Sequence, residues 1–403
     1  MATLAAFAFG TIGFVSRLDL FLVFAALIRL MGGFSMAVLW SAVLAILLAS
    51  HPDRPAAVYA IIDTTYGLGL SFGPVLGTFL YKFSGFLLPF YICGGGIFTT
   101  GMLALPLIRS LRIVKEKSLD RPSARPLLRS PVFLTALLAT SVTAFSSFGF
   151  ALNLLGLHLS SLGMTTSSVG ICFFSFSATY TLINILSGVV TDTYIPPWTV
   201  TVAGLFSLFL SFFLLGPFPL LPIPSGLPWK IAGLMLLGFG AGSVLTAAYS
   251  CALNEALQTP TFPEDVQTYS LVSSLWTASF SIGSFLGTSL AGPLFDNIGW
   301  DWSCTVVQGL ISMVLAFSVT AAYVVRQRKE KEEMKRKNSN RRVSILQVQT
   351  QPCLTLARTT MNISQQVVLV KSFHALIVWF THKSLSEINS DFNSEGNLHA
   401  REK

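Results

Sequence analysis

Three ionisable side chains stand inside long apolar segments of this 403-residue chain: Arg29, Asp63 and Glu255. A charge placed among apolar residues in a membrane is costly, so it needs a partner or a water-filled cavity. A carboxylate in such a place can bind an ammonium group or a proton. The sequence therefore indicates polar sites buried within a membrane protein.

Each of the three has a structural alternative. Arg29 could extend its side chain to the lumenal surface. Asp63 could be a helix-start residue, which the positive end of the helix dipole favours. Glu255 closes the apolar segment 229–255 and could simply mark the cytoplasmic end of that helix. Both interpretations stay open for all three residues.

Polar and aromatic side chains that could line a pocket also lie within apolar segments. Asn153 and Asn184 could line a cavity or hydrogen-bond between helices. His158, near a segment end, is interpreted as an interfacial residue that could also respond to pH. An aromatic ring can hold a cation against its face, although most rings of this chain pack or face lipid. The aromatic candidates are Tyr66, Tyr249, Trp276 and Phe280.

A glycine pattern occurs twice. The first copy consists of Gly67, Gly69, Gly73, Pro74, Gly77 and Gly85, and Gly283, Gly287 and Gly299 follow Gly69, Gly73 and Gly85 at an offset of 214 residues. Glycines three or four residues apart let two helix backbones touch in lipid. Pro74 removes one helix hydrogen bond and bends its segment. A repeat of this length predicts two related membrane bundles.

Composition and hydropathy determine the elements that position these residues. Hydrophobic residues make up 52% of the chain and charged residues only 11%. Apolar runs of about 18 residues or more can span a bilayer. We expect spans at about 20–48, 57–81, 86–108, 131–158, 167–192, 198–216, 229–255, 269–295 and 302–326, after a shorter apolar stretch at 2–16. The fold class is therefore an all-α membrane protein.

The net charge of +8 is concentrated in two clusters, with seven Lys or Arg in 109–129 and nine in 326–342. Basic loops stay on the cytoplasmic side. The six spans between the clusters return the chain to the same side, so the clusters indicate topology and not nucleic-acid binding. We expect a helix bundle at 1–108, a basic cytoplasmic linker at 109–130, a six-helix bundle at 131–326 and a largely disordered cytosolic tail at 327–403.

Enzymatic chemistry finds no support in the sequence. There is no Ser/His/Asp arrangement on loops, no phosphate-binding loop and no zinc-ligand spacing. The five cysteines lack metal-ligand spacing, and most lie in apolar segments, where a thiol acts as a small hydrophobe. We therefore expect no catalytic residues, no metal site and no cofactor.

Several segments resemble a known family. Tyr66–Gly77 resembles the antiporter motif on the fifth helix of the major facilitator superfamily. Arg29–Gly33 resembles its fourth-helix pattern, and Gly188–Asp192 resembles the loop after its eighth helix. The runs 67–90 and 272–302 resemble the vesicular amine transporters, and most closely their polyamine-transporting subgroup.

The resemblance implies a major facilitator fold of two pseudo-symmetric bundles. The spans would number as helices four to twelve, with residues 1–19 as the remnant of helix three. Helices one and two would be absent, so the bundle at 1–108 would be incomplete. The resemblance carries a role in proton coupling onto Arg29. It also implies that the glycine motif seals one side of the protein while the two halves rock about a central site.

The resemblance implies proton-coupled antiport of an organic cation, a polyamine or a monoamine, into acidic vesicles of the secretory or synaptic type. The expected partners are this cation, protons and the lipid bilayer, with no nucleic acid. One alternative is a transport-inactive truncated membrane protein that acts through a partner, such as a full-length sibling. Another is a plasma-membrane multidrug:proton antiporter.

Overall fold

The computed structural model describes residues 1–15, 17–110, 123–216, 226–259 and 262–359. The chain divides into two compact units, Met1–Val325 and Arg326–Lys403, each treated by itself. Most of the predicted basic linker and the end of the predicted tail, residues 111–122 and 360–403, lie outside the described residues.

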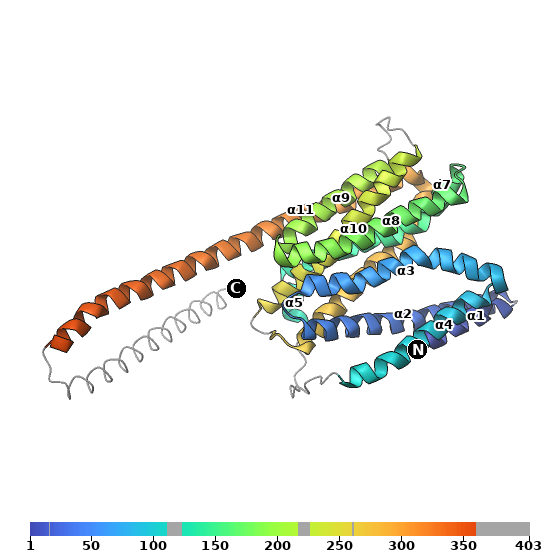
Figure 1. Ribbon diagram of the computed structural model, residues 1–403. Coiled ribbons are helices and arrows are strands. Elements are labelled where there is room, and N and C mark those ends of the chain that lie inside the picture. Colours follow the sequence, from blue (N-terminus) through green and yellow to red (C-terminus); the bar gives the residue numbers. More distant parts are fainter. Residues whose placement is uncertain (16, 111–122, 217–225, 260–261, 360–403) are drawn as a thin grey trace. The chain divides into compact units, whose positions relative to one another are not determined.

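All regular elements among the described residues are helices, which confirms the all-α prediction. In chain order the elements are α1 (Ala2–Thr11), the 3-10 turn η1 (Ile12–Phe14), α2 (Leu18–Ser50), α3 (Pro55–Ser84), α4 (Leu87–Ser110), α5 (Arg125–Arg129), α6 (Pro131–Thr143), the π-helical η2 (Ala144–Ala151), α7 (Leu152–Ser161), α8 (Thr166–Thr193), α9 (Pro197–Leu215), α10 (Leu227–Leu257) and α11 (Val266–Thr359). In the first unit the helices run side by side, and α3 lies between α2 and α8 (Figure 1).

Among the described residues, seven helices are long and apolar enough to cross a membrane. Nine spans were expected, and two differences account for the gap. The helix α3 is not among the seven, because Asp63 and its many glycine and hydroxyl residues lower its hydropathy. The expected spans 269–295 and 302–326 both lie in α11, which is interrupted at Gly299. The protein is an integral membrane protein.

The glycine repeat marks equivalent turns in the two halves. Gly85 ends α3 with φ 72°, and Gly299, its counterpart, breaks α11 with φ 75°. Side chains with a Cβ rarely adopt such angles, whereas glycine does so at little cost. After Gly299 the next segment of α11 contacts α9, where the Gln308 side chain donates a hydrogen bond to the Phe209 carbonyl. Gly85 and Gly299, the last glycines of the two copies, therefore both form a turn that ends a helix.

The helices α9 and α10 approach closely through small residues. A Cβ at Gly240 would stand 2.8 Å from the Gly204 carbonyl oxygen, so neither backbone leaves room for a larger side chain. Two serines of α9 reach across to α10 carbonyls, Ser207 to Leu236 at 2.9 Å and Ser211 to Gly233 at 2.8 Å. Close backbones and interhelical hydrogen bonds are how helices associate in lipid, where the hydrophobic effect is absent.

The first segment of α11 packs equally tightly on α6 and η2. An added methyl group at Gly283 would collide with the Ser141 carbonyl, and one at Gly287 would stand 2.8 Å from the Gly149 Cα. The Ser141 hydroxyl donates to the Ser279 carbonyl at 3.0 Å. The second copy of the glycine pattern therefore serves a contact inside the second half of the chain.

The first helices form a smaller assembly. Phe7 and Phe9 of α1 pack against Tyr91 and Phe90 of α4 with tilted rings, 5.3 and 5.0 Å between centroids. Much of the surface of α2 consists of exposed large apolar side chains, as expected of a helix in contact with lipid.

In the second unit, α11 continues from Arg326 to Thr359. An exposed pair at helical i, i+4 spacing, Arg326 and Glu330, is 3.0 Å apart. Exposed pairs of this kind contribute little to stability. The predicted disordered tail is thus helical in backbone as far as Thr359.

The packing of α11 predicts that Gly283→Ala destabilises the protein, because the new methyl group must displace the backbone of α6. Overpacking of this kind costs about 1–3 kcal/mol, so the thermal unfolding temperature in detergent should fall. Gly292→Ala on the same helix is the control, since nothing lies within 4 Å of a Cβ there. Equal unfolding temperatures for the two variants would contradict this packing.

Candidate functional site

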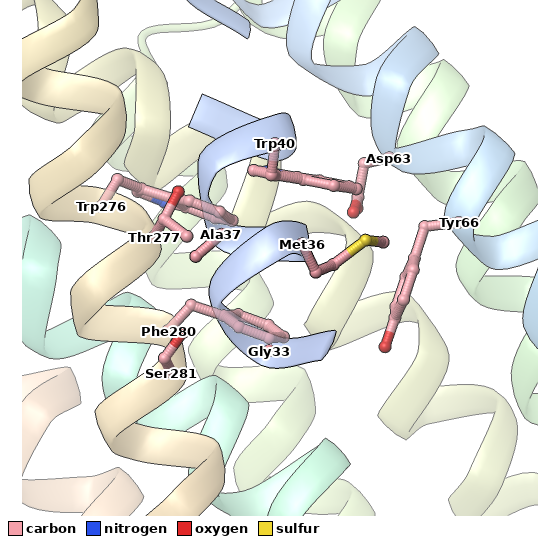
Figure 2. Close-up of a pocket in the computed structure, with 10 residues that line it drawn as sticks. All are labelled: Gly33, Met36, Ala37, Trp40, Asp63, Tyr66, Trp276, Thr277, Phe280 and Ser281. Atoms are coloured by element: carbon pink, nitrogen blue, oxygen red, sulfur yellow. The ribbon is translucent and has the colours of Figure 1, made fainter. Parts of the chain in front are cut away.

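A cavity of about 250 Å³ lies where α2, α3 and α11 meet. Figure 2 shows α2 in the middle, with α11 residues on one side and α3 residues on the other. Its lining consists of Gly33, Met36, Ala37, Trp40, Asp63, Tyr66, Trp276, Thr277, Phe280 and Ser281. The first two helices belong to the first half of the chain and α11 to the second, so the cavity lies between the halves.

Asp63 is the one lining residue that carries a carboxylate. It lies in the third turn of α3 and is 2% exposed. Its Oδ2 accepts hydrogen bonds from the Tyr180 hydroxyl at 2.5 Å and from the Asn184 side-chain amide at 2.8 Å, both on α8. The Asp63 side chain therefore bridges the first and second halves while facing the cavity.

Aromatic rings form most of the wall around this carboxylate. Trp40 meets Tyr66 edge to face at 6.0 Å between ring centroids, and Trp276 stacks on Phe280 at 5.8 Å. Behind the lining, Tyr59 stacks on Tyr249 at 5.1 Å. Ring faces carry partial negative charge and attract cations.

The lining has side chains that could hold a cation. Within the described part of the chain no Lys, Arg or His lies within ion-pair distance of Asp63, and a buried charge is expected to be paired. The same residues contain no cluster of side chains that could hold a metal ion. An organic cation could pair with the carboxylate while its apolar part contacts the rings.

Comparison with protein families decides the identity. Residues 1–261 match the Major Facilitator Superfamily model. The chain belongs to the Major Facilitator Superfamily. The fold and family expected from the glycine motif are thereby confirmed.

Individual members of the superfamily are similar over most of their length. The MFS-type transporter SLC18B1 of Homo sapiens is 30% identical over 321 residues, which are 79% of this chain and 68% of the relative. The protein of the same name from Mus musculus is 28% identical over 82% of this chain and 72% of the relative. These relatives are transporters, and the chain is a membrane transport protein by family.

Two solved structures share the fold. A bacterial homologue of the iron transporter ferroportin, in an outward-facing state, superposes with a TM-score of 0.62 at 14% identity and covers 80% of both chains. The human organic anion transporter MFSD10 (TETRAN) gives 0.53 at 18% identity, covering 79% of this chain and 76% of its own. At these identities the likeness concerns the superfamily fold alone.

The structure brings six of the predicted site residues together. Asp63, Tyr66, Trp276 and Phe280 line the cavity. Asn184 is buried behind Asp63 and bonded to it, and Tyr249 packs on Tyr59 with its hydroxyl 3.0 Å from the Ser273 hydroxyl. Asp63 does not start its helix, since α3 begins at Pro55. The helix-start alternative for Asp63 is therefore wrong.

Three predicted residues lie outside this lining. The Arg29 guanidinium lies over the Phe9 ring of α1, at 4.5 Å from its centroid. The Asn153 amide donates to the Phe148 and Gly149 carbonyls, which the π-helical turn frees from the regular pattern. Glu255, near the end of α10, accepts from the Ser130 hydroxyl at 2.7 Å.

His158 also lies away from the cavity. Its ring stacks on Trp300 with centroids 4.2 Å apart and an interplanar angle of 8°. This contact joins α7 to the turn in α11.

Only one of the four glycines of the first motif copy that lie within α3 packs closely against another helix. At Gly67 an added Cβ would meet Tyr180 and Thr181 of α8, whereas nothing lies within 4 Å at Gly69, Gly73 or Gly77. The Pro74 side chain lies outside the described residues. Gly283 and Gly287 contact α6 and η2, as described above. The motif therefore contributes Gly67 to the α3–α8 contact, one turn beyond Asp63.

The Gly188–Asp192 segment completes that contact. The Asp192 carboxylate of α8 accepts from the Ala56 and Ala57 backbone amides at 3.1 and 2.8 Å, in the first turn of α3. Those amides have no partner within their own helix, and the helix dipole favours a negative charge there. At Gly188 a Cβ would stand 3.1 Å from the Ala56 carbonyl oxygen. The two halves are thus held together from the start of α3 to Gly67.

Sequence reasoning missed most of the α2 wall and Tyr180, one of the two partners of Asp63 on α8. A signal was present: Gly33, Met36, Ala37 and Trp40 are spaced three, four and seven residues from the first, which places them on one helix face. Tyr180 carried no such signal, because its role depends on a helix more than 100 residues distant.

The α3–α8 contact predicts unequal effects within the glycine motif. Gly67→Ala should push α8 away from α3 and reduce the activity of the site, because the added methyl group meets Tyr180 and Thr181. Gly73→Ala should be tolerated, since its Cβ points into open space and alanine favours helices by up to about 1 kcal/mol. Transport per folded molecule is the measurement. A larger loss for Gly73→Ala would refute the assignment.

Proposed function

We propose that the protein is a proton-coupled antiporter of organic cations, with Asp63 exchanging a proton for an ammonium group. The observation that carries the proposal is the pairing of one buried carboxylate with aromatic walls and no nearby cationic side chain among the described residues. The superfamily and the similarity to SLC18B1 transporters support transport as the activity.

Charge balance makes Asp63 the exchange site. A carboxylate removed from water is expensive unless a positive charge lies beside it. Either an ammonium or a proton supplies that charge, and the two compete for the same oxygen. A site that holds one or the other while facing opposite sides of the membrane in turn couples two opposite fluxes.

The cavity walls suggest the class of cation. Ligand pockets usually have volumes of about 300–1,000 Å³, so a cavity of about 250 Å³ favours a small amine. The Trp40, Tyr66, Trp276 and Phe280 rings can contact its charged head and its apolar part. A polyamine and a monoamine both meet these requirements, and we propose that the substrate is one of them.

The position of the cavity suits alternating access. Helices α2 and α3 move with the first half and α11 with the second, so relative motion of the halves opens and closes the cavity. The bonds of Asp192 to the start of α3 and the packing at Gly188 would close one end in this conformation.

We further propose that the protein acts in an acidic vesicle with its C-terminus in the cytosol. The basic clusters 109–129 and 326–342 favour the cytosolic side. A proton gradient directed out of the vesicle would then drive amine accumulation. A tag at the C-terminus, probed in intact and permeabilised cells, tests the orientation.

Asp63→Asn should abolish uptake, because the amide keeps the shape of the side chain but cannot neutralise a cation. The measurement is uptake of radiolabelled spermidine and dopamine by the purified chain in inside-acid proteoliposomes, with a loss of about tenfold or more expected. Asp296→Asn, an exposed carboxylate on α11, is the control and should leave uptake unchanged. Uptake that persists in Asp63→Asn, or that ignores the proton gradient, would overturn the proposal.

A further inference from the structure

The two oxygens of Asp63 have different surroundings. Both hydrogen bonds to its side chain, from Tyr180 and from Asn184, end on Oδ2. Among the described residues no donor bonds to Oδ1, and the side chain borders the cavity. One oxygen is thus fixed to α8, while the other remains to receive a cation or a proton.

The amide of Asn184 is itself held in one orientation. The Thr246 hydroxyl of α10 donates to the Asn184 Oδ1 at 3.0 Å, so the amide nitrogen is the atom that faces Asp63. Asn184 and Thr246 are both fully buried, so water does not replace these bonds. A continuous chain of donors therefore runs from α10 through α8 to the carboxylate on α3.

Close contacts between α3, α8 and α10 make this series of hydrogen bonds possible. A Cβ at Gly242 of α10 would stand 3.0 Å from the Tyr180 carbonyl and 3.3 Å from the Asn184 nitrogen. On the other side, Gly67 of α3 leaves room for the Tyr180 ring, which lies 3.1 Å from the position of a Cβ there. The Tyr180 ring also stacks on Phe176 at 5.8 Å. The donors are therefore supplied by the second half of the chain and their acceptor by the first.

We propose that Tyr180, Asn184 and Thr246 are positioning residues that make the charge of Asp63 depend on the packing of α3 against α8. This inference rests on the proposed exchange at Asp63. While the helices are packed, two donors stabilise the charged carboxylate and its free oxygen binds the cation. When the halves separate at this level, the carboxylate loses both donors and takes up a proton in place of the cation.

Asp63 is the carboxyl group of the cavity lining, and the titratable side chains around it are tyrosines. The titratable side chains facing it are Tyr59 and Tyr66 from its own helix and Tyr180 from α8, with Tyr249 of α10 stacked on Tyr59. Tyrosine ordinarily ionises near pH 10. The neighbours from α2 and α11, Trp40 and Trp276, do not titrate.

The test is the pH dependence of cation binding to the purified full chain, with radiolabelled spermidine and dopamine as probes. Protons compete with the probe, so binding falls as the pH is lowered through a midpoint. Tyr180→Phe keeps the ring and removes one donor, which favours the protonated carboxylate. Its midpoint should rise by about one pH unit. Thr246→Val frees the Asn184 amide to turn, and its midpoint should rise by a smaller amount.

Two matched variants separate positioning from general damage. Thr246→Ser keeps the hydroxyl and should restore the wild-type midpoint. Thr140→Val removes an equally buried hydroxyl that bonds only within its own helix, to the Ala136 carbonyl at 3.1 Å, and should leave the midpoint unchanged. The number of binding sites per folded molecule, measured at high pH, should stay the same in all variants of Tyr180, Thr246 and Thr140.

The outcomes separate the two proposals. If Asp63→Asn abolishes binding but Tyr180→Phe and Thr246→Val keep the wild-type midpoint, the positioning role is overturned and the exchange site stands. If the wild-type chain binds neither probe, or Asp63→Asn still binds, the exchange site falls and the positioning role falls with it. Because the two variants lie on different helices, failure of one to fold leaves the other to decide.

Discussion

The site depends on one buried carboxylate held across the contact between the two halves of the chain. Asp63 lies on α3 and its hydrogen-bond donors lie on α8, so these donors stabilise the charge only while the two halves are in contact. In a membrane an unpaired charge is expensive. This constraint explains why the Asp63 carboxylate is hydrogen-bonded to α8 within a protein that is otherwise strongly apolar.

The requirement for close helix contact follows from that constraint. A hydrogen bond of 2.5–2.8 Å between side chains on neighbouring helices requires backbones that approach closely. Gly67 on α3 and Gly242 on α10 provide the space on either side of α8. Asp192 accepts two further hydrogen bonds, which join α8 to the start of α3. In lipid, small residues and a few polar bonds therefore hold the helices together, as the burial of apolar surface does in water.

The two halves use the same glycine pattern in different ways. Gly85 and Gly299 share a backbone conformation and end a helix in each half. Gly283 and Gly287 contact α6 and η2, whereas Gly69 and Gly73, their counterparts, have no neighbour within 4 Å. A repeat in the sequence thus preserves the turn, while the contacts along the helix depend on which neighbours are present.

The sequence by itself determined the fold class, the membrane location and the family, because long apolar runs and glycine spacing are local properties of the chain. It also made Asp63 a candidate, since a carboxylate in an apolar segment is rare and costly. Only the tertiary structure decided which candidates meet: Arg29, Asn153 and Glu255 share the same polar character but contact Phe9, η2 and Ser130. The Tyr180 and Thr246 contacts join residues far apart in sequence, and no local pattern encodes which helix faces pack together.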